Sequence, residues 1–188
     1  FPVGNPIGHR CLVKIGGDLV IVTTQGAIPL SQLIQTDRAK ADLIAITSKI
    51  NGLFNEATRS YKSNFGWQGF IYGKGGWAIF NVPATEGSRQ WQFVQNLITG
   101  AWCTFSGLNA NCLATLNDEL YFGGNAGVVY RADSGAQDAG GQINYELQTA
   151  FDICGAKGQA KFFTMMRPFY LTSGVTAILA GVNVDFDD

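Results

Sequence analysis

Few residues of this chain have the type and spacing that catalysis requires. The one histidine, His9, lies in a Gly- and Pro-rich start. A His-based metal site needs more than one imidazole, and a Cys–His nucleophile pair would need His9 beside a cysteine, which nothing in the spacing supports. We therefore expect no catalytic, metal-binding or cofactor-binding residues and no cofactor, and we expect that the protein is not an enzyme.

Acidic residues are the next candidates, because glycosidases use two carboxylates that face each other across a cleft. Most of them lie in turn-like strings, where an Asp side chain bonds its own backbone, and we interpret them as turn residues. The string 133–141 (DSGAQDAGG) lacks the EF-hand spacing of a calcium loop. The candidate carboxylates are Asp18, Glu86, Asp118, Glu119, Asp133, Asp138, Glu146, Asp152 and Asp185.

The cysteines and the glycine-rich strings lack the patterns of metal and phosphate sites. No two cysteines have the CxxC spacing of zinc sites. The strings 73–76 (GKGG) and 123–127 (GGNAG) lie in predicted hairpins, whereas a phosphate loop lies between a strand and a helix. We expect free, buried thiols, two of them at equivalent positions of a repeat. The four cysteines are Cys11, Cys103, Cys112 and Cys154.

The predicted strands that would position these residues occur in a sequence repeat. Residues 11–29 (CLVKIGGDLVIVTTQGAIP) align without a gap with residues 112–130 (CLATLNDELYFGGNAGVVY). Each copy predicts a strand, an acidic turn, a second strand, a glycine turn and a third strand. Repeated antiparallel meanders of this kind are typical of propeller blades.

We therefore predict a mainly β fold, with antiparallel β-meander blades of a partial β-propeller and one inserted amphipathic helix at about 36–61. Blade-like repeats are expected at about 11–35 and 112–133, with a hairpin unit at 64–105 between them. We expect residues 1–188 to form a single domain and to be a fragment of a larger β-propeller protein.

The predicted helix carries one apolar stripe at helical spacing. Thr36 is its expected N-cap, and Gly52 weakens its interior. The stripe could pack on the chain's own sheet or on a neighbouring subunit, and both alternatives stay open. The stripe consists of Leu43, Ile46, Ile50, Leu53, Phe54, Ala57 and Tyr61.

Further strands are expected between and after the two copies of the repeat. Trp77–Val82 is expected to end at Pro83 and to pair with Gln90–Gln95, which alternates apolar and polar residues. The other expected strands are Phe70–Tyr72, Ala101–Phe105, Ile143–Phe151, Ala160–Leu171 and Val175–Phe186.

Composition limits the function classes. Of the 188 residues 46% are hydrophobic and 14% are charged, against roughly 25% charged in soluble domains. Such a chain fits either an all-β domain or a protein that hides much of its surface in an assembly. The net charge is −1 without a basic patch, so binding to DNA phosphates is not indicated. No apolar run reaches about 18 residues, and no membrane span is expected.

Several strings together resemble the β-propeller-containing tail hub, or nozzle, proteins of short-tailed bacteriophages and their prophage relatives. The resemblance runs over nearly the whole chain, and the order of the motifs and the inserted helix carry more of it than any single motif. The strings are GDLVIVTTQGAIPLSQ (17–32), ITSKI (46–50), FGWQ (65–68), IFNVP (79–83), NLITGAWCTFSGLNANC (96–112), LYFGGNAGVVYRAD (120–133) and the G-x-x-D-x-G-G-x-I string 135–143.

The resemblance implies a structural virion protein without a catalytic site. Several copies would form a homo-oligomeric ring around the DNA exit channel, below the portal and adaptor. The ring would extend the tube and serve as the attachment platform that holds tail fibres or a needle. DNA would pass without sequence-specific binding. The protein would be located in the virion tail after assembly in the host cytoplasm.

Two alternatives remain, a β-propeller module that binds a glycan or cell-surface receptor through loops on one face, and a glycosidase. Tryptophans buried between sheets would favour the structural reading, whereas tryptophans grouped in an open groove would favour recognition. The expected interaction surfaces are the helix stripe and the loops 84–89 and 133–141. The tryptophans in question are Trp67, Trp77, Trp91 and Trp102.

Overall fold

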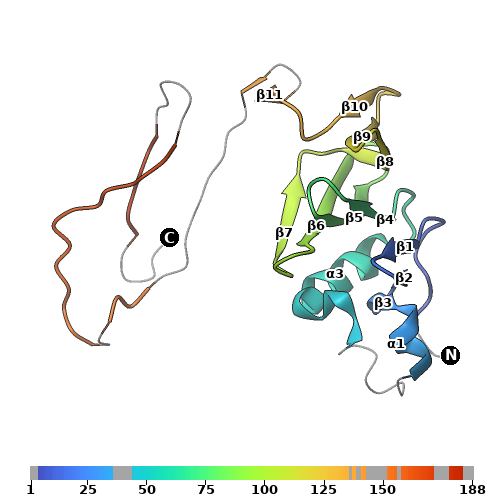
Figure 1. Ribbon diagram of the computed structural model, residues 1–188, viewed down its shortest axis with the longest axis horizontal. Helices are drawn as coiled ribbons and strands as arrows, with labels where there is room; N and C mark the ends of the chain where they lie inside the picture. Colours follow the sequence, from blue (N-terminus) through green and yellow to red (C-terminus); the bar gives the residue numbers. More distant parts are fainter. Residues whose placement is uncertain are drawn as a thin grey trace. The chain divides into compact units, whose positions relative to one another are not determined.

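Contacts within the chain define two units, Phe1–Gly135 and Ala136–Asp188. The prediction from the sequence is a single domain over residues 1–188. Each unit is described by itself (Figure 1). The computed structural model describes residues 4–35, 44–135, 137–138, 141–142, 152–155, 158–171 and 178–183.

The first unit contains three antiparallel meander sheets that follow one another along the chain (Figure 1). The first sheet has the order β1-β2-β3, the second β4-β5-β6-β7 and the third β8-β9-β10. The mainly β prediction is confirmed, and the described strands do not close into a barrel or propeller. The strands are β1 (Leu12–Ile15), β2 (Asp18–Thr23), β3 (Gly26–Pro29), β4 (Gln68–Tyr72), β5 (Trp77–Thr85), β6 (Arg89–Asn96), β7 (Trp102–Ser106), β8 (Ala110–Leu116), β9 (Glu119–Gly124) and β10 (Val129–Arg131).

The sequence repeat is also a repeat of strand register. Leu12 lies opposite Ile21 in the first sheet, and Leu113 lies opposite Phe122 in the third. All four residue pairs of the β1–β2 hairpin recur in the β8–β9 hairpin at the same offset along the chain. The third strands differ by one residue, because Gly123 pairs with Val129 while its counterpart Val22 pairs with Ala27. The first two strands therefore follow the repeat, and the glycine turn after them does not.

The central strands of the second sheet, β5 and β6, are buried on both faces. One face packs against the first sheet and helix α3 (Asn51–Tyr61), and the other packs against the third sheet. This arrangement explains why β5 has six consecutive buried residues from Ala78 to Pro83. The first cluster contains Ile7, Val13, Val20, Val22, Ala27, Phe54, Ala57, Trp67, Ala78, Phe80, Val82 and Phe93, and the second contains Tyr72, Ile79, Val94, Ala110, Leu113 and Leu120.

The inserted helical segment packs on the chain's own core. A 3-10 helix, η2 (Ile46–Ile50), leads into α3, and Phe54 and Ala57 of α3 are buried. The later part of the predicted helix is confirmed, and Ile46, Ile50 and Tyr61 also pack against the first cluster. Leu53 was expected in the stripe, but its side chain is 58% exposed. Residues 36–43, with Thr36 and Leu43, lie outside the described residues, and a short helix, α1 (Leu30–Gln35), precedes them.

The ends of several predicted strands are corrected by the structure. β5 continues past Pro83 to Thr85, because a bulge between Val82 and Thr85 takes the proline out of the regular ladder. The expected strand Ala160–Leu171 is wrong, since these residues form no strand. Of the expected strand Val175–Phe186, residues 178–183 are described and are also not a strand, and Ile143–Phe151 lies outside the described residues.

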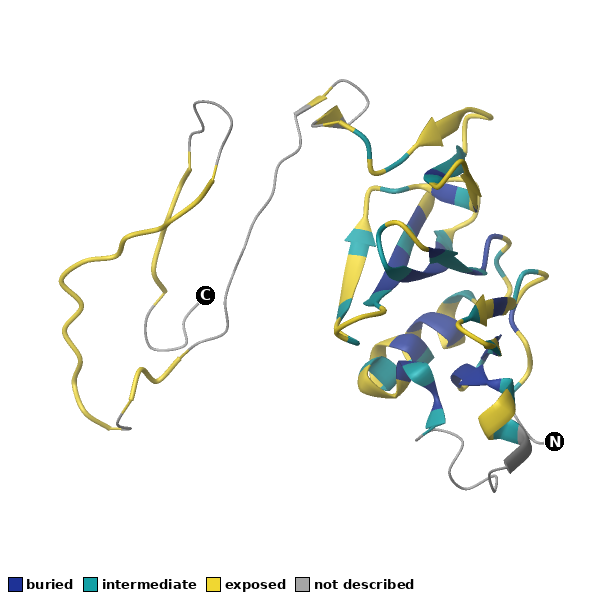
Figure 2. Ribbon diagram, in the orientation of Figure 1, coloured by how far each residue is buried: buried dark blue, intermediate teal, exposed yellow. Residues whose placement is uncertain are grey.

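The described part of the second unit exposes large apolar side chains. Its one sheet pairs β11 (Gln137–Asp138) with β12 (Gly141–Gln142). Residues 158–171 have neither helix nor regular strand and are exposed throughout, as Figure 2 shows in yellow. Phe162 is 96% and Leu171 103% exposed, and Leu179 of the next described segment is 103% exposed.

A close approach between the first and second sheets explains Gly69. A Cβ atom at this position of β4 would lie 3.0 Å from Cγ1 and 3.2 Å from Cβ of Val13, which is itself in the core. We expect Gly69→Val to lower the free energy of unfolding by about 1–3 kcal/mol, because the added carbons would overpack this contact. Urea unfolding followed by circular dichroism measures the change.

The control for this prediction is Gly17→Val in the β1–β2 turn, where a Cβ atom meets nothing within 4 Å. An equal loss of stability in the two variants would contradict the close approach of the sheets.

Candidate functional site

The polar residues of the first unit gather along the seam between its sheets, and Gln68 at the start of β4 is where all three sheets meet. Its Oε1 accepts a hydrogen bond from the backbone N–H of Leu113 (2.9 Å) and one from the Arg10 guanidinium (3.1 Å). Its Nε2 donates to the carbonyl oxygen of Leu113 (3.0 Å). Arg10 also donates to the carbonyl oxygen of Asn111 (3.0 Å). The Gln68 side chain thus satisfies both the N–H and the carbonyl oxygen of Leu113 in β8, and it also hydrogen-bonds to Arg10, just before β1.

A second group of amides crosses the interface between the second and third sheets. Asn81, which is fully buried, donates to the carbonyl oxygens of Gly66 and Ala110, both at 2.8 Å. Gln92, also fully buried, donates to Asn81 Oδ1 (2.8 Å) and to the carbonyl oxygen of Leu108 (2.7 Å). These amides satisfy backbone groups that would otherwise be buried without a partner.

The amide group continues to the edge of the interface. Asn125, in the β9–β10 turn, donates to Gln90 Oε1 (3.0 Å) and to the carbonyl oxygen of Ser88 (2.9 Å), and it accepts from Asn111 Nδ2 (2.6 Å). Gln90 is 1% exposed. The sequence analysis missed these residues. The signal is present, since Gln90 and Gln92 alternate with Trp91 and Phe93, but glutamines in an alternating strand are usually assigned to the solvent face.

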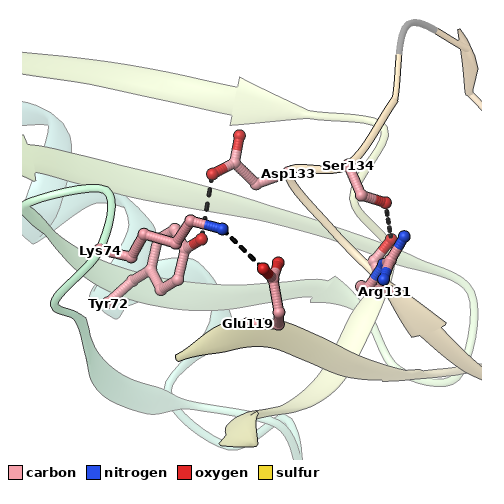
Figure 3. Close-up of polar contacts among 6 residues, drawn as sticks. All are labelled: Tyr72, Lys74, Glu119, Arg131, Asp133 and Ser134. Carbon is pink, nitrogen blue, oxygen red and sulfur yellow. Dashed lines mark hydrogen bonds and ion pairs between the residues drawn. The ribbon is translucent and has the colours of Figure 1, made fainter. Parts of the chain in front are cut away.

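Charged groups gather at the end of the same interface (Figure 3). Figure 3 shows Tyr72 directed at Asp133 and Lys74 directed at Glu119. The buried Tyr72 hydroxyl donates to Asp133 Oδ2 at 3.0 Å, and Lys74 Nζ lies 2.6 Å from Glu119 Oε1. Asp133 has a φ of 52°, a left-handed conformation that Asp tolerates better than most residues. The Ser134 hydroxyl donates to the carbonyl oxygen of Arg131.

The pKa values of this cluster follow from its contacts. Desolvation, the hydrogen bond to Asp133 and the charge of that carboxylate raise the pKa of Tyr72 above its ordinary value. The hydrogen bond and charge of Lys74 lower the pKa of Glu119, and the same bond raises the pKa of Lys74. These shifts hold Tyr72 and Lys74 protonated and Glu119 ionised at neutral pH. Proton transfer calls for the opposite, a group whose pKa approaches the working pH.

The candidate carboxylates of the sequence analysis separate into different surroundings. Asp18 accepts hydrogen bonds from the Ser31 hydroxyl and from two backbone N–H groups, which lower its pKa. Asp152 accepts from the backbone N–H of Cys154. Glu86 and Asp118 lie exposed in turns, as predicted. Glu119 and Asp133 are tied to Lys74 and Tyr72. Glu146, Asp185 and the side chain of Asp138 lie outside the described residues.

A cavity of about 260 Å³ lies beside the chain start that carries His9. Its lining also includes Arg10, whose guanidinium carbon is 5.6 Å from the centre of the Phe65 ring and whose N–H groups bind the polar seam. No carboxylate and no thiol lines this cavity, so it contains neither a glycosidase pair nor a Cys–His pair. The lining residues are Gly8, His9, Arg10, Lys62, Ser63, Asn64, Phe65, Gly66 and Trp67.

The cysteine prediction is partly wrong. All four cysteines are free thiols, but Cys103, Cys112 and Cys154 are exposed, and Cys11 is half-buried against the first cluster. The cause lies in the sheet faces. The two copies of the repeat bury opposite faces, and a bulge between Ala110 and Cys112 leaves Leu113 as the inward residue of β8. Desolvation raises the pKa of the Cys103 thiol even though the residue as a whole is exposed.

The four tryptophans belong to the packing between sheets. Trp67 is 2% exposed and donates to the carbonyl oxygen of Tyr61 (2.8 Å). Trp91 and Trp102 are half-buried against the first cluster, and Trp77 is half-buried against the second. Trp77 makes an edge-to-face contact with Phe105, with ring centres 5.5 Å apart.

Comparison of the chain with protein-family models, with curated proteins and with solved structures finds no match. Within the described ranges, no three His, Cys, Asp or Glu side chains are grouped so that they could hold a metal ion. None of the described helices has the length and hydrophobicity needed to cross a membrane.

The buried amides are open to a direct test with Asn81→Leu. This change would leave Gln92 and the carbonyl oxygens of Gly66 and Ala110 without their partner. We expect the free energy of unfolding to fall by about 2–4 kcal/mol, since each buried polar group left unsatisfied costs about 1–3 kcal/mol. Urea unfolding measures the loss, with Gln95→Leu on strand β6 as the control. Equal stability of the two variants would show that the amides do not hold the sheets.

Stability below neutral pH should depend on Glu119. Its lowered pKa means that the unfolded chain takes up the proton first, so its contribution is present above the usual value of 4.5 and is lost as the pH falls through the folded pKa. We expect Glu119→Gln to flatten the fall in unfolding free energy between about pH 7 and about pH 3 by a small amount, because the pair is partly exposed. Urea unfolding at a series of pH values measures this slope. The control is Glu86→Gln in an exposed turn, and equal slopes would contradict the prediction.

Proposed function

We propose that this chain is a structural, non-enzymatic protein of a bacteriophage tail, a hub or nozzle in which several copies form a ring around the DNA exit channel. The observation that carries the proposal is the exposed apolar surface of the second unit, where Phe162, Phe169 and Leu171 are 96%, 87% and 103% exposed. Large apolar side chains left exposed in such number along one segment are expected to be covered by contact with another protein.

The resemblance of the sequence to tail hub proteins supports the location and the neighbours that we propose for this assembly. It assigns the ring to the virion tail, assembled in the host cytoplasm, with an adaptor and tail fibres or a needle as neighbours. The net charge of −1 is compatible with a channel wall along which DNA passes without sequence-specific binding.

The three sheets support a partial propeller as the finer description of the fold. In a propeller, four-stranded meander sheets stand side by side around a central channel. Here β1 contacts β4 and β4 contacts β8, so the first strands of successive sheets adjoin. The second sheet has the four strands of a propeller blade, and its neighbours have three.

The tryptophans favour the structural role over glycan or receptor recognition. A glycan-binding module would present aromatic rings in an open groove, on which sugars stack. Here Trp67 is buried, and Trp77, Trp91 and Trp102 each pack against one of the two core clusters. For a glycosidase, the described candidate carboxylates offer no support, because Glu119 and Asp133 are held by separate donors.

The assembly role is tested by electron microscopy of negatively stained protein together with its mass from light scattering. We expect a ring with a central channel and a mass that is a multiple of the chain. A compact monomer that binds members of a glycan array would favour the recognition module instead.

The location is tested separately. Antibodies raised against this chain should label the tail end of intact phage particles that carry the protein, seen by immunogold electron microscopy. Labelled heads, or particles without label, would contradict the virion-tail assignment whatever the oligomeric state of the purified chain.

A further inference from the structure

The first and third sheets use opposite faces to pack against the second sheet. In the first sheet Val13 and Val20, which lie opposite each other, are 7% and 1% exposed and face the second sheet. In the third sheet the inward residues are Leu113 and Leu120, which are 4% and 2% exposed. The second sheet therefore lies between two sheets that share a repeat but do not share a packed face.

Positions that are packed in one of the two sheets are equivalent, in the repeat, to positions on the open face of the other. Leu12 and Leu19 are the counterparts of Leu113 and Leu120, and they are 55% and 37% exposed on the open side of the first sheet. On the open side of the third sheet, Ala114 is the exposed counterpart of the buried Val13. Each open face thus carries the positions that its sister sheet buries.

The two open faces carry both apolar and charged residues and lie at opposite ends of the series of sheets. The leading face is the β1 part of this side of the first sheet, with Leu12, Lys14 and Leu19 exposed. Over β3 the same side is covered, since Ile28 is fully buried. The trailing face belongs to the third sheet, where Leu116 is 62% and Val129 70% exposed. Figure 2 shows exposed residues, in yellow, on β1 and along β8 and β10. By strand register, the trailing face consists of Cys112, Ala114, Leu116, Glu119, Tyr121, Gly123, Val129 and Arg131.

We propose that the leading face of one copy of this chain packs on the trailing face of a second copy, so that the sheets of successive copies continue one series. We assign a second copy to each face because of the repeat. The residues on each open face are equivalent, in the repeat, to residues that the other sheet packs against the second sheet of the same chain. This proposal deepens the proposed function and rests on it: it assigns the surfaces by which the ring would form.

The geometry makes this contact heterologous, since the two faces differ and each copy carries one of each. Contacts of this kind form closed rings or open filaments rather than two-fold dimers. They also leave every assembly with one unused leading face and one unused trailing face until a ring closes. That property separates head-to-tail packing from a symmetric dimer in solution.

The first test compares variants by sedimentation velocity over a range of concentrations. Leu12→Glu and Leu116→Glu each place a charge on one open face, at residues that are 55% and 62% exposed. We expect each to weaken self-association at least tenfold, with an unchanged circular dichroism spectrum. The control is Ile98→Glu in the β6–β7 turn, on neither face, where the side chain is 90% exposed.

Mixing the two variants tests the direction of packing. The Leu12→Glu variant keeps an intact trailing face, and the Leu116→Glu variant keeps an intact leading face. An equimolar mixture should therefore form a one-to-one dimer that does not grow further, although each variant alone stays monomeric. A mixture that stays monomeric would overturn head-to-tail packing in favour of a symmetric contact.

A chemical footprint gives an independent measurement on the unaltered chain. Cys112 lies on the trailing face, whereas Cys103 lies on strand β7 of the second sheet, and both are exposed. Alkylation of Cys112 should slow at least severalfold as the concentration rises through the association range, while alkylation of Cys103 keeps its rate. Equal behaviour of the two thiols would overturn the proposal.

The outcomes separate this inference from the proposed function. A chain that associates as strongly with Leu12→Glu and Leu116→Glu as with Ile98→Glu would overturn the face-to-face contact and leave an assembly made through the second unit. A chain that is monomeric at every concentration would also overturn it, and the immunogold labelling would then decide the virion assignment.

Discussion

The burial of the central strands of the second sheet on both faces is the constraint on which the rest of the first unit depends. A sheet with apolar side chains on both sides needs a partner on each, and the first sheet with α3 supplies one partner while the third sheet supplies the other. This requirement explains the two separate core clusters and the half-buried tryptophans between the sheets. It also explains why two sheets of one repeat pack through opposite faces, because they approach the same neighbour from opposite sides.

Apolar packing alone would let the sheets slide, and the amides add a defined alignment. Gln68 hydrogen-bonds to both backbone groups of Leu113. Asn81 and Gln92 donate to the carbonyl oxygens of Ala110 and Leu108 at the start of β8. Hydrogen bonds of this kind are geometrically demanding, and a shift of one residue would leave buried groups unsatisfied. Tyr72 with Asp133 and Lys74 with Glu119 close the same interface at its solvent end.

Much of the β structure could be predicted from the sequence, because alternation and turn glycines are local signals. The hairpin of Trp77–Val82 with Gln90–Gln95 and the meander of 11–29 are examples. Other features depend on packing that no local pattern contains. Cys112 was expected to be buried like Cys11, but burial follows from the side on which the neighbouring sheet lies. From the alternating pattern Gln92 is predicted on the surface, but the third sheet covers it. Leu53 is predicted in the apolar stripe of the helix, but the buried stripe is narrower than predicted and leaves Leu53 out. The candidate interface could not be predicted for the same reason.

Each sheet consists of strands that follow one another in the chain, and this topology affects the order of folding. Because each described sheet is made of strands that are consecutive in the chain, each can form from local contacts soon after its residues leave the ribosome. The first sheet then waits with Val13 and Val20 uncovered until residues 68–106 have been made. During synthesis, the period of greatest risk of misassembly thus falls between the completion of β3 and that of β7, when an apolar sheet exists without the layer that covers it.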